Sequence, residues 1–347
     1  MTTMMEEVLG QPVALSGLRK FYASPGSIRT KALRDLTPHW PPTVVFTGMG
    51  SSLFAAYPAQ AFLTSLGIRA LVWEAAELVH HHLGALKSDT LLVAVSQSGE
   101  TAEILSLLEA LPKKFGLAAV VNVERSTLAR RADLMLPMMA GAQESVSTRT
   151  YMCAVAALMY LAHAIAGKPS RPLTSALRRI VEAQERILER RTVTCPPTLQ
   201  FLNEPPYLAL MARGADLASA YQGAQMFKEV ARLAAEPISA AQFRHGPIEI
   251  LNPQHRYVLF ARQGKTGTFV LRLARDIQSH GGRVLLLTDL DFPNMPGTRV
   301  IPVERVALGL GTLVDVLHIQ LIVHGIALRA RPEPGEFWIA DRVTREE

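Results

Sequence analysis

The sequence predicts an α/β protein that contains two tandem doubly wound parallel sheets. Three observations lead to this prediction. The chain has 347 residues, 49% of them hydrophobic, which is enough to bury two separate cores. Short apolar runs alternate with helix-length stretches, as is typical of parallel sheets. The second half of the chain repeats the pattern of the first.

Nine apolar runs have the length and composition of buried strands. Five lie in the first half of the chain, at residues 43–47, 70–74, 90–95, 118–123 and 134–137. Four lie in the second half, at residues 207–211, 257–261, 284–288 and 300–303. We expect each set to form one parallel sheet, with the intervening stretches as helices.

The two halves also match residue by residue at one common offset. The matched pairs are Gly50 and Gly214, Leu53 and Leu217, Ala56 and Ala220, and Tyr57 and Tyr221. Between the halves, Arg171–Arg191 is charged and helical in pattern, and Pro196–Pro197 follows it. We therefore expect a first domain at residues 1–195, including an N-terminal segment and a linker helix, and a second at 196–347, including a C-terminal tail.

Composition argues against several classes of protein. The net charge is +6, but Lys and Arg are scattered and no nucleic-acid-binding motif is evident. The start, residues 1–7, is polar and acidic rather than a secretory signal. The most apolar segment, residues 306–330, contains Asp315, His318 and His324, which suits a core helix better than a membrane span. We expect a cytoplasmic protein that binds neither nucleic acid nor membrane.

Metal and cysteine chemistry are not expected. The two cysteines, Cys153 and Cys195, make neither a disulfide framework nor a metal site. The run His80-His81-His82 is also a poor metal site, because adjacent helical side chains diverge by about 100°. The sequence gives no indication of a cofactor.

A hydroxyl-rich turn follows the third apolar run. Ser96, Ser98, Gly99 and Thr101 lie where a buried strand ends and a helix begins. The first N–H groups of a helix lack internal partners and carry partial positive charge, so this turn is suited to bind a phosphate. The alternative is a helix start that only caps itself through Ser98 or Thr101. Three hydroxyls exceed what one cap needs, which favours the phosphate.

Three loops should converge at the carboxyl ends of the first set of strands, where ligands bind in such sheets: residues 48–52, 96–101 and 142–148. Glycines in the first loop let the backbone approach a ligand, and Ser51 and Ser52 begin the next helix. Opposite Ser96–Thr101, the second half has Arg262–Thr266 and no serine. We expect one phosphate site per chain.

Together these motifs resemble the tandem sugar isomerase (SIS) domain family, and within it the isomerase half of glucosamine-6-phosphate synthase and the SIS-type glucosamine-6-phosphate deaminases. The resemblance implies two flavodoxin-like SIS domains and covers nearly the whole chain. It rests on Met5–Pro12, Gly48–Ser52, Ser96–Thr101, Gln143–Arg149, Gln222–Glu229 and Arg244–Pro247.

The resemblance also implies roles for individual residues. Glu229 would be the proton shuttle, and His245 would open the sugar ring from the neighbouring subunit, which implies a homodimer with shared sites. Taken alone, Glu229 is more typical of an interface carboxylate and His245 of a turn histidine, but their joint match favours catalysis. The sugar phosphate would be held by Ser52, Ser96, Gln97, Ser98 and Thr101, with Gly50, Ser51, Ser147 and Arg342 as further substrate-binding residues.

The chain departs from the synthase pattern at two lysines. Met226 stands where one lysine is usual, and Asp341 followed by Arg342 stands where the tail lysine forms a Schiff base. No N-terminal cysteine precedes the sugar-binding half, so glutamine is not expected as the nitrogen donor.

We therefore expect conversion of glucosamine 6-phosphate, or a close amino-sugar 6-phosphate, to fructose 6-phosphate and ammonia. The steps are ring opening, proton transfer from C2 to C1, and imine hydrolysis. The alternatives are a ketosamine-6-phosphate deglycase or aminotransferase-like isomerase, and a sugar-phosphate sensor without turnover.

Overall fold

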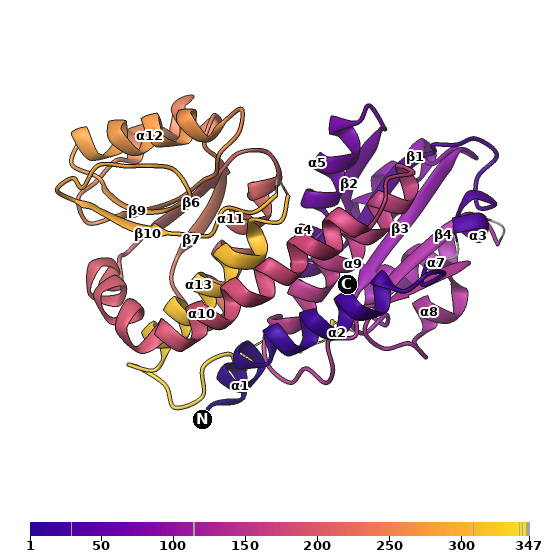
Figure 1. The fold of residues 1–347 in the computed structure, drawn as a ribbon, viewed down its shortest axis with the longest axis horizontal. Coiled ribbons are helices and arrows are strands. Elements are labelled where there is room, and N and C mark those ends of the chain that lie inside the picture. Colours follow the sequence, from indigo (N-terminus) through magenta and orange to yellow (C-terminus); the bar gives the residue numbers. More distant parts are fainter. Residues whose placement is uncertain (29, 114, 308, 340, 342, 345–347) are drawn as a thin grey trace. The chain divides into compact units, whose positions relative to one another are not determined.

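The computed structural model describes the chain apart from residues 29, 114, 308, 340, 342 and 345–347. The chain divides into two compact units, and each contains one parallel sheet (Figure 1). The first-sheet unit comprises Gly10–Gln143, Ser147–Val181 and Phe337–Glu347. The second-sheet unit comprises Met1–Leu9, Glu144–Val146 and Glu182–Glu336.

The first-sheet unit has five parallel strands in the order β2-β1-β3-β4-β5, which is the flavodoxin-like order. The strands are β1 (Thr43–Gly48), β2 (Ala70–Glu74), β3 (Thr90–Ser96), β4 (Leu117–Val121) and β5 (Leu134–Pro137). All five predicted strands are confirmed. The central strand β3 is buried along its whole length, as expected for an apolar run covered on both faces.

Helices cover both faces of this sheet. On one face, β-strand residues such as Val45 and Leu92 pack with Ile104 and Leu107 of α7 and Leu128 of α8. The other helices include α9, which is buried over most of its length and packs against α2, α4 and α5. The helices of the unit are α2 (Gln11–Ala23), α3 (Thr30–Arg34), α4 (Ser51–Phe54), α5 (Tyr57–Ser65), α6 (Ala75–Glu77), η1 (Leu78–His82), η2 (Leu83–Ala85), α7 (Ala102–Ala110), α8 (Thr127–Arg131) and α9 (Arg149–Ile165).

The second-sheet unit repeats the topology. Its order, β7-β6-β8-β9-β10, places the strands as in the first sheet, and every pair is parallel. Gly50 and Gly214, matched in the sequence, both have positive φ, at +50° and +60°. The predicted repeat is therefore confirmed. The strands are β6 (Leu208–Ala212), β7 (Ala235–Ser239), β8 (Arg256–Ala261), β9 (Arg283–Thr288) and β10 (Thr298–Pro302).

Strand β7 is the one strand that the sequence reading missed. It contains Glu236 and Pro237, and only Ala235 is fully buried, so it lacks the apolar pattern of a buried strand. It lies at the edge of the sheet and pairs only with β6. Edge strands tolerate proline because one side of the strand donates no ladder hydrogen bond.

Helices also lie on both faces of the second sheet. Figure 1 shows α12 on one side and α11 with α13 on the other. Helix α13 is buried almost throughout, which confirms the prediction of a core helix in residues 306–330. The helices are α1 (Thr3–Leu9), η3 (Gly214–Asp216), α11 (Leu217–Met226), η4 (Phe227–Ala231), η5 (Gln242–Arg244), η6 (Pro247–Ile250), α12 (Gly267–Ser279) and α13 (Thr312–Ala327). Within the described residues, no helix combines the length and the apolar character that a membrane crossing needs.

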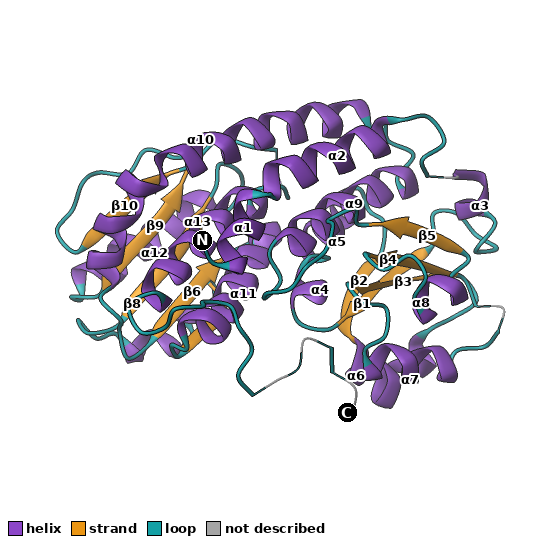
Figure 2. Cartoon of the chain, turned by 90° about the horizontal axis from the view of Figure 1, so that it is seen from below, coloured by secondary structure: helices purple, strands orange, loops and turns teal. Residues whose placement is uncertain are grey.

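A long helix, α10 (Arg171–Leu202), carries the chain from one unit to the other (Figure 2). The units divide between Val181 and Glu182, inside this helix. Pro196 and Pro197, which we expected at the join, also lie within α10. The expected domains 1–195 and 196–347 remain a prediction.

Candidate active site

The loop between β3 and α7, residues 96–101, has a fixed conformation that its own side chains maintain. Ser96 ends β3 and is 4% exposed, and its Oγ accepts a hydrogen bond from the Gly99 N–H at 3.0 Å. The Ser98 Oγ accepts one from the Glu100 N–H at 3.2 Å. Gly99 has φ +66°, and a Cβ there would lie 2.2 Å from the Ser126 Oγ. Only glycine fits this turn.

Thr101 carries a hydroxyl that makes no hydrogen bond to the described residues. It occupies the N-cap position of α7 with φ −68° and ψ 145°, yet its side chain makes no capping bond. Its Oγ1 atom is buried and has no hydrogen-bond partner among the residues that the structure describes. The self-capping alternative is therefore wrong for Thr101, although Ser98 does serve the backbone. Such a hydroxyl is able to donate a hydrogen bond to a ligand or to water.

The three predicted loops meet in the first-sheet unit. Ser51, Ser52, Gln97 and Ser147 line one small cavity, with walls from Met138, Thr150, Tyr151 and Ala154. Its free volume is about 10 Å³, which holds about one water. The Ser51 Oγ is buried and, within the described part of the chain, has no hydrogen-bond partner. The predicted convergence of the loops at the carboxyl ends of β1, β3 and β5 is confirmed.

Two further contacts involve the helix starts that follow these loops. The Ser147 Oγ lies 2.9 Å from the Thr150 Oγ1, at the start of α9. The Ala102 N–H, in the first turn of α7, donates to the Thr344 carbonyl of the C-terminal tail at 3.0 Å. A carbonyl oxygen is a partial negative charge, so this contact uses the same property of the helix start that would bind an anion.

The loop that carries Ser147 is anchored by a residue that the sequence reading did not single out. The Glu7 carboxylate, 3% exposed, accepts hydrogen bonds from the Glu144 N–H at 2.6 Å and the Ser145 N–H at 3.2 Å. It also accepts one from the Ser145 Oγ at 2.5 Å. Charge-assisted bonds of this kind are among the strong ones in proteins. Glu7 is thus a positioning residue, and it lies in the motif Met5–Pro12.

Glu229 belongs to the second-sheet unit, in the π-helical turn η4 that continues α11. Such turns are rare and often mark functional sites. Burial raises the pKa of Glu229, and the Gln225 hydrogen bond and the Lys228 charge oppose that shift. Gln225 Nε2 donates to Glu229 Oε1 at 2.7 Å. The apolar surroundings expected from the sequence are present, since Met226, Phe227 and Val230 are fully buried.

His245 lies on a different turn of the same unit. It follows η5, is exposed to solvent, and donates its backbone N–H to the Gln242 carbonyl at 2.9 Å. Its imidazole makes no hydrogen bond within the described part of the chain. Arg342 lies outside the described residues, and Asp341 is exposed.

The second half of the repeat places a buried ion pair where the first half places hydroxyls. Arg262 follows β8 as Ser96 ends β3, and its guanidinium pairs with Asp315. The two side chains are 5% and 0% exposed. Arg262 also donates to the Glu304 and Gly311 carbonyls at 2.8 and 3.2 Å, and the Ser219 Oγ donates to Asp315 at 2.9 Å. This filled position supports the expectation of one phosphate site per chain.

Among the described residues, no group of three or more His, Cys, Asp or Glu side chains is placed to hold a metal ion. His80, His81 and His82 lie on the π-helical turn η1. Cys153 is fully buried, and burial raises its pKa to about 12, so its thiol is inert.

Comparison with solved structures shows the fold of the whole chain. The C-terminal domain of glucosamine-fructose-6-phosphate aminotransferase from Francisella tularensis superposes with a TM-score of 0.86 at 21% identity, covering 94% of this chain and 96% of that one. Glucosamine-6-phosphate deaminase from Thermotoga maritima gives a TM-score of 0.75 at 19% identity, covering 99% of each chain. At such identities the likeness shows the fold alone.

Sequence relatives and a family model show the family to which the chain belongs. Glutamine–fructose-6-phosphate aminotransferase from Thermus thermophilus is 28% identical over 291 residues, which are 80% of this chain and 48% of that protein. The enzyme of the same name from Methanocaldococcus jannaschii is 26% identical over 328 residues, 92% of this chain and 29% of the relative. The chain thus spans half or less of these relatives. The SIS domain model matches residues 40–164 and 201–297, so the chain belongs to the SIS domain family.

Proposed function

We propose that this chain is a phosphosugar isomerase whose substrate is an amino-sugar 6-phosphate, and that it converts glucosamine 6-phosphate to fructose 6-phosphate and ammonia. The observation that carries the proposal is that the hydroxyls of Ser51 and Thr101 are both buried and lack a hydrogen-bond partner among the described residues. They follow the neighbouring strands β1 and β3: Ser51 begins α4, and Thr101 is the N-cap residue of α7. Such an arrangement suits a phosphate, which accepts several hydrogen bonds at once.

Glu229 supplies the base of the proposed reaction. In the open-chain sugar, its carboxylate takes the proton from C2 and returns it to C1, while O1 gains a proton and the amino nitrogen loses one. The product is an imine at C2, and addition of water there releases ammonia and leaves the ketone of fructose 6-phosphate. Burial raises the pKa of Glu229, which makes the carboxylate a stronger base than an exposed glutamate.

His245 is proposed to open the sugar ring, from the neighbouring subunit of a homodimer. Its exposure and its unpartnered imidazole leave the ring available to a second chain. An imidazole suits this step because it both donates and accepts a proton near neutral pH. The assignment rests on the resemblance of Arg244–Pro247 to the family motif.

The substrate must bring its own nitrogen in this scheme. Met226 is fully buried and is not an amine, so the position that usually carries a lysine offers no partner for an imine. Hydrolysis of an amino-sugar phosphate needs no such partner, because the imine forms on the substrate itself. This favours the deaminase direction over transfer through an enzyme-bound imine.

A second candidate is an isomerase or deglycase that acts on another 6-phosphorylated ketosamine. The curated relatives at 26–28% identity, all named aminotransferases, favour it, because their substrate fructose 6-phosphate is a ketose. Proton transfer between C1 and C2 runs in either direction, so the same carboxylate serves both candidates.

Ammonia release from purified protein tests the proposal. The substrates are glucosamine 6-phosphate, galactosamine 6-phosphate, a fructosamine 6-phosphate and unphosphorylated glucosamine. We expect ammonia from a phosphorylated aldosamine and none from glucosamine. Turnover of the ketosamine alone would favour the second candidate, and equal turnover of phosphorylated and free glucosamine would contradict a phosphate site.

A further inference from the structure

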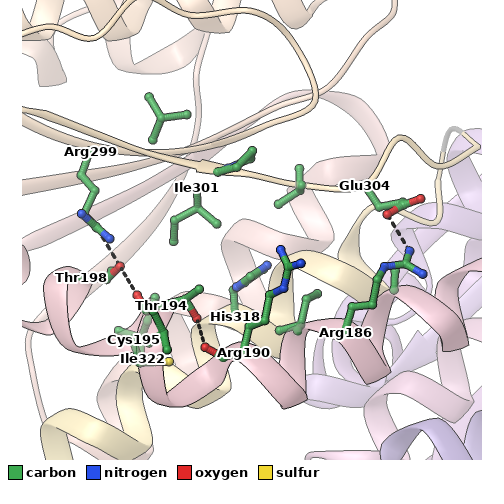
Figure 3. Close-up of a pocket in the computed structure, with 16 residues that line it drawn as sticks. Arg186, Arg190, Thr194, Cys195, Thr198, Arg299, Ile301, Glu304, His318 and Ile322 are labelled. Atoms are coloured by element: carbon green, nitrogen blue, oxygen red, sulfur yellow. Dashed lines mark hydrogen bonds and ion pairs between the residues drawn. The ribbon is translucent and has the colours of Figure 1, made fainter.

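The second-sheet unit contains a cavity of about 400 Å³ that none of the proposed sugar-phosphate or catalytic residues lines. It lies between α10 and β10, with α13 contributing His318 and Ile322 (Figure 3). A volume of this size is within the usual range of small-molecule sites, about 300–1,000 Å³. The cavity is therefore large enough for a small molecule other than the sugar phosphate.

The cavity carries net positive charge. Its lining includes Arg186, Arg190 and Arg299 but only one acidic residue, Glu304. Glu304 pairs with Arg186 at 2.8 Å, and Arg299 Nε donates to the Thr198 Oγ1 at 2.8 Å.

Arg190 is the arginine that has no such partner. Its guanidinium makes no hydrogen bond or ion pair within the described part of the chain, and Figure 3 shows it extending from α10 toward β10. His318 adds no charge at neutral pH, because burial and the nearby Arg262 lower its pKa to about 4. Arg190 and one further positive charge are thus uncompensated.

The rest of the lining is largely apolar. Ile187 and Val193 come from α10, Ile301 and Val303 from the segment of β10, and Ile322 from α13. An inorganic anion would satisfy the arginines but leave these side chains in contact with water. A molecule with an apolar body would cover them, which is favourable in proportion to the area buried.

The edge of β10 argues against a peptide strand as the occupant. The Val303 N–H donates to the Thr288 carbonyl of β9 at 3.0 Å, so the backbone of the preceding residue, Pro302, faces away from β9. β10 is an edge strand, and Pro302 has no N–H to offer a further strand. The missing N–H of Pro302 therefore favours a small molecule over an added strand.

We propose that this cavity binds a small organic anion, with its anionic head at Arg190 and Arg299 and a short apolar body against Ile187, Ile301 and Ile322. The site is separate from the proposed sugar-phosphate site. Binding at this cavity is measurable without any assay of turnover. A negative result for this proposal is therefore distinguishable from a negative result for the proposed function.

Cys195 provides a test confined to this cavity. It lines the cavity and is half-buried, whereas the other cysteine of the chain, Cys153, is fully buried. The rate of Cys195 alkylation by iodoacetamide is measured at pH 8.5 with octanoate, octanol or inorganic phosphate. We expect octanoate to slow alkylation, and octanol and phosphate to have no effect at the same concentrations.

Two variants complete the experiment. Arg190→Ala should raise the octanoate concentration that gives half protection by about tenfold, because a charge-assisted contact is lost. Arg179→Ala, on an exposed position of the same helix outside the cavity, removes the same charge and should leave protection unchanged. Equal protection by octanol, no protection by octanoate, or equal protection in the Arg190→Ala variant would each overturn the proposal.

Discussion

Replacing Thr101 with valine should weaken sugar-phosphate binding without destabilising the protein. The Thr101 Oγ1 is buried, has no partner in the described residues and makes no capping bond, so the usual loss of about 0.5–2 kcal/mol for an N-cap does not apply. Removing an unsatisfied buried hydroxyl leaves the free energy of unfolding unchanged or raises it by about 1 kcal/mol. If that hydroxyl binds the phosphate, the variant loses about 1.5–3 kcal/mol of binding, or roughly 10- to 150-fold in affinity.

The assay is calorimetric titration with glucitol 6-phosphate, an open-chain sugar phosphate that cannot isomerise. Urea unfolding of the same samples gives the free energy of unfolding. Ser51→Ala should behave like Thr101→Val, because the Ser51 Oγ is also buried and unpartnered.

Thr90→Val is the matched control. Thr90 lies at the opposite end of β3, and its Oγ1 accepts a hydrogen bond from the Lys87 N–H at 3.1 Å. This variant should lose about 0.5–1.5 kcal/mol of stability and keep its affinity. If the Thr101→Val variant binds glucitol 6-phosphate within twofold of the unmodified protein while the control behaves as stated, the placement of the phosphate at this loop is refuted.

Three further outcomes follow from the same contacts. Gly99→Ala should cost about 2 kcal/mol or more in urea unfolding, because it forces an alanine to φ +66° and against the Ser126 Oγ; wild-type stability would contradict this. Because burial raises the pKa of Glu229, kcat/KM should fall as pH drops through a value above 4.5, and a profile flat down to pH 4.5 would argue against this base. Burial and Asp315 raise the pKa of Asp216 to about 7, so the folded chain keeps a proton that the unfolded chain releases, and stability should fall as pH rises from 4 to 7. Between pH 4 and 7, the free energy of unfolding of Asp216→Asn should fall by up to about 4 kcal/mol less than that of the unmodified protein. The same pH dependence of unfolding in both proteins would contradict this.

The fold was predictable where the pattern is local and strongly apolar. Buried strands such as β3 consist of consecutive apolar residues, and the repeat fixed the second sheet by analogy with the first. The edge strand β7 escaped because Glu236 and Pro237 interrupt its pattern, and only the position at the sheet edge makes them acceptable. Pro196 and Pro197 indicated a break, yet α10 continues through them.

The exposure of α10 explains why the prolines are tolerated. Thr192 and Val193, whose carbonyls lose their helical partners to Pro196 and Pro197, are exposed, and water is able to replace the missing N–H groups. The sequence shows the two prolines, but it does not show that the carbonyls they leave without partners are exposed to water.

The sequence predicted the motif residues of the candidate site but not the residues that hold them in place. Ser51, Ser52, Gln97 and Ser147 stand at strand ends that sheet topology brings together. The role of Glu7 could not be predicted, because its hydrogen-bond partners lie more than a hundred positions away along the chain. The contact of Gln225 with Glu229 could have been predicted, since Gln225 lies four residues earlier and therefore on the same helical face.

The central claim is that Glu229 moves the C2 proton of a phosphosugar, and isotope exchange tests it most directly. Glucosamine 6-phosphate is incubated in deuterium oxide with the unmodified protein or with Glu229→Gln, and deuterium at C2 is measured. Glucitol 6-phosphate affinity is measured in parallel. The account predicts exchange by the unmodified protein, none by Glu229→Gln, and nearly equal affinities. Exchange at an unchanged rate in the Glu229→Gln variant would contradict it.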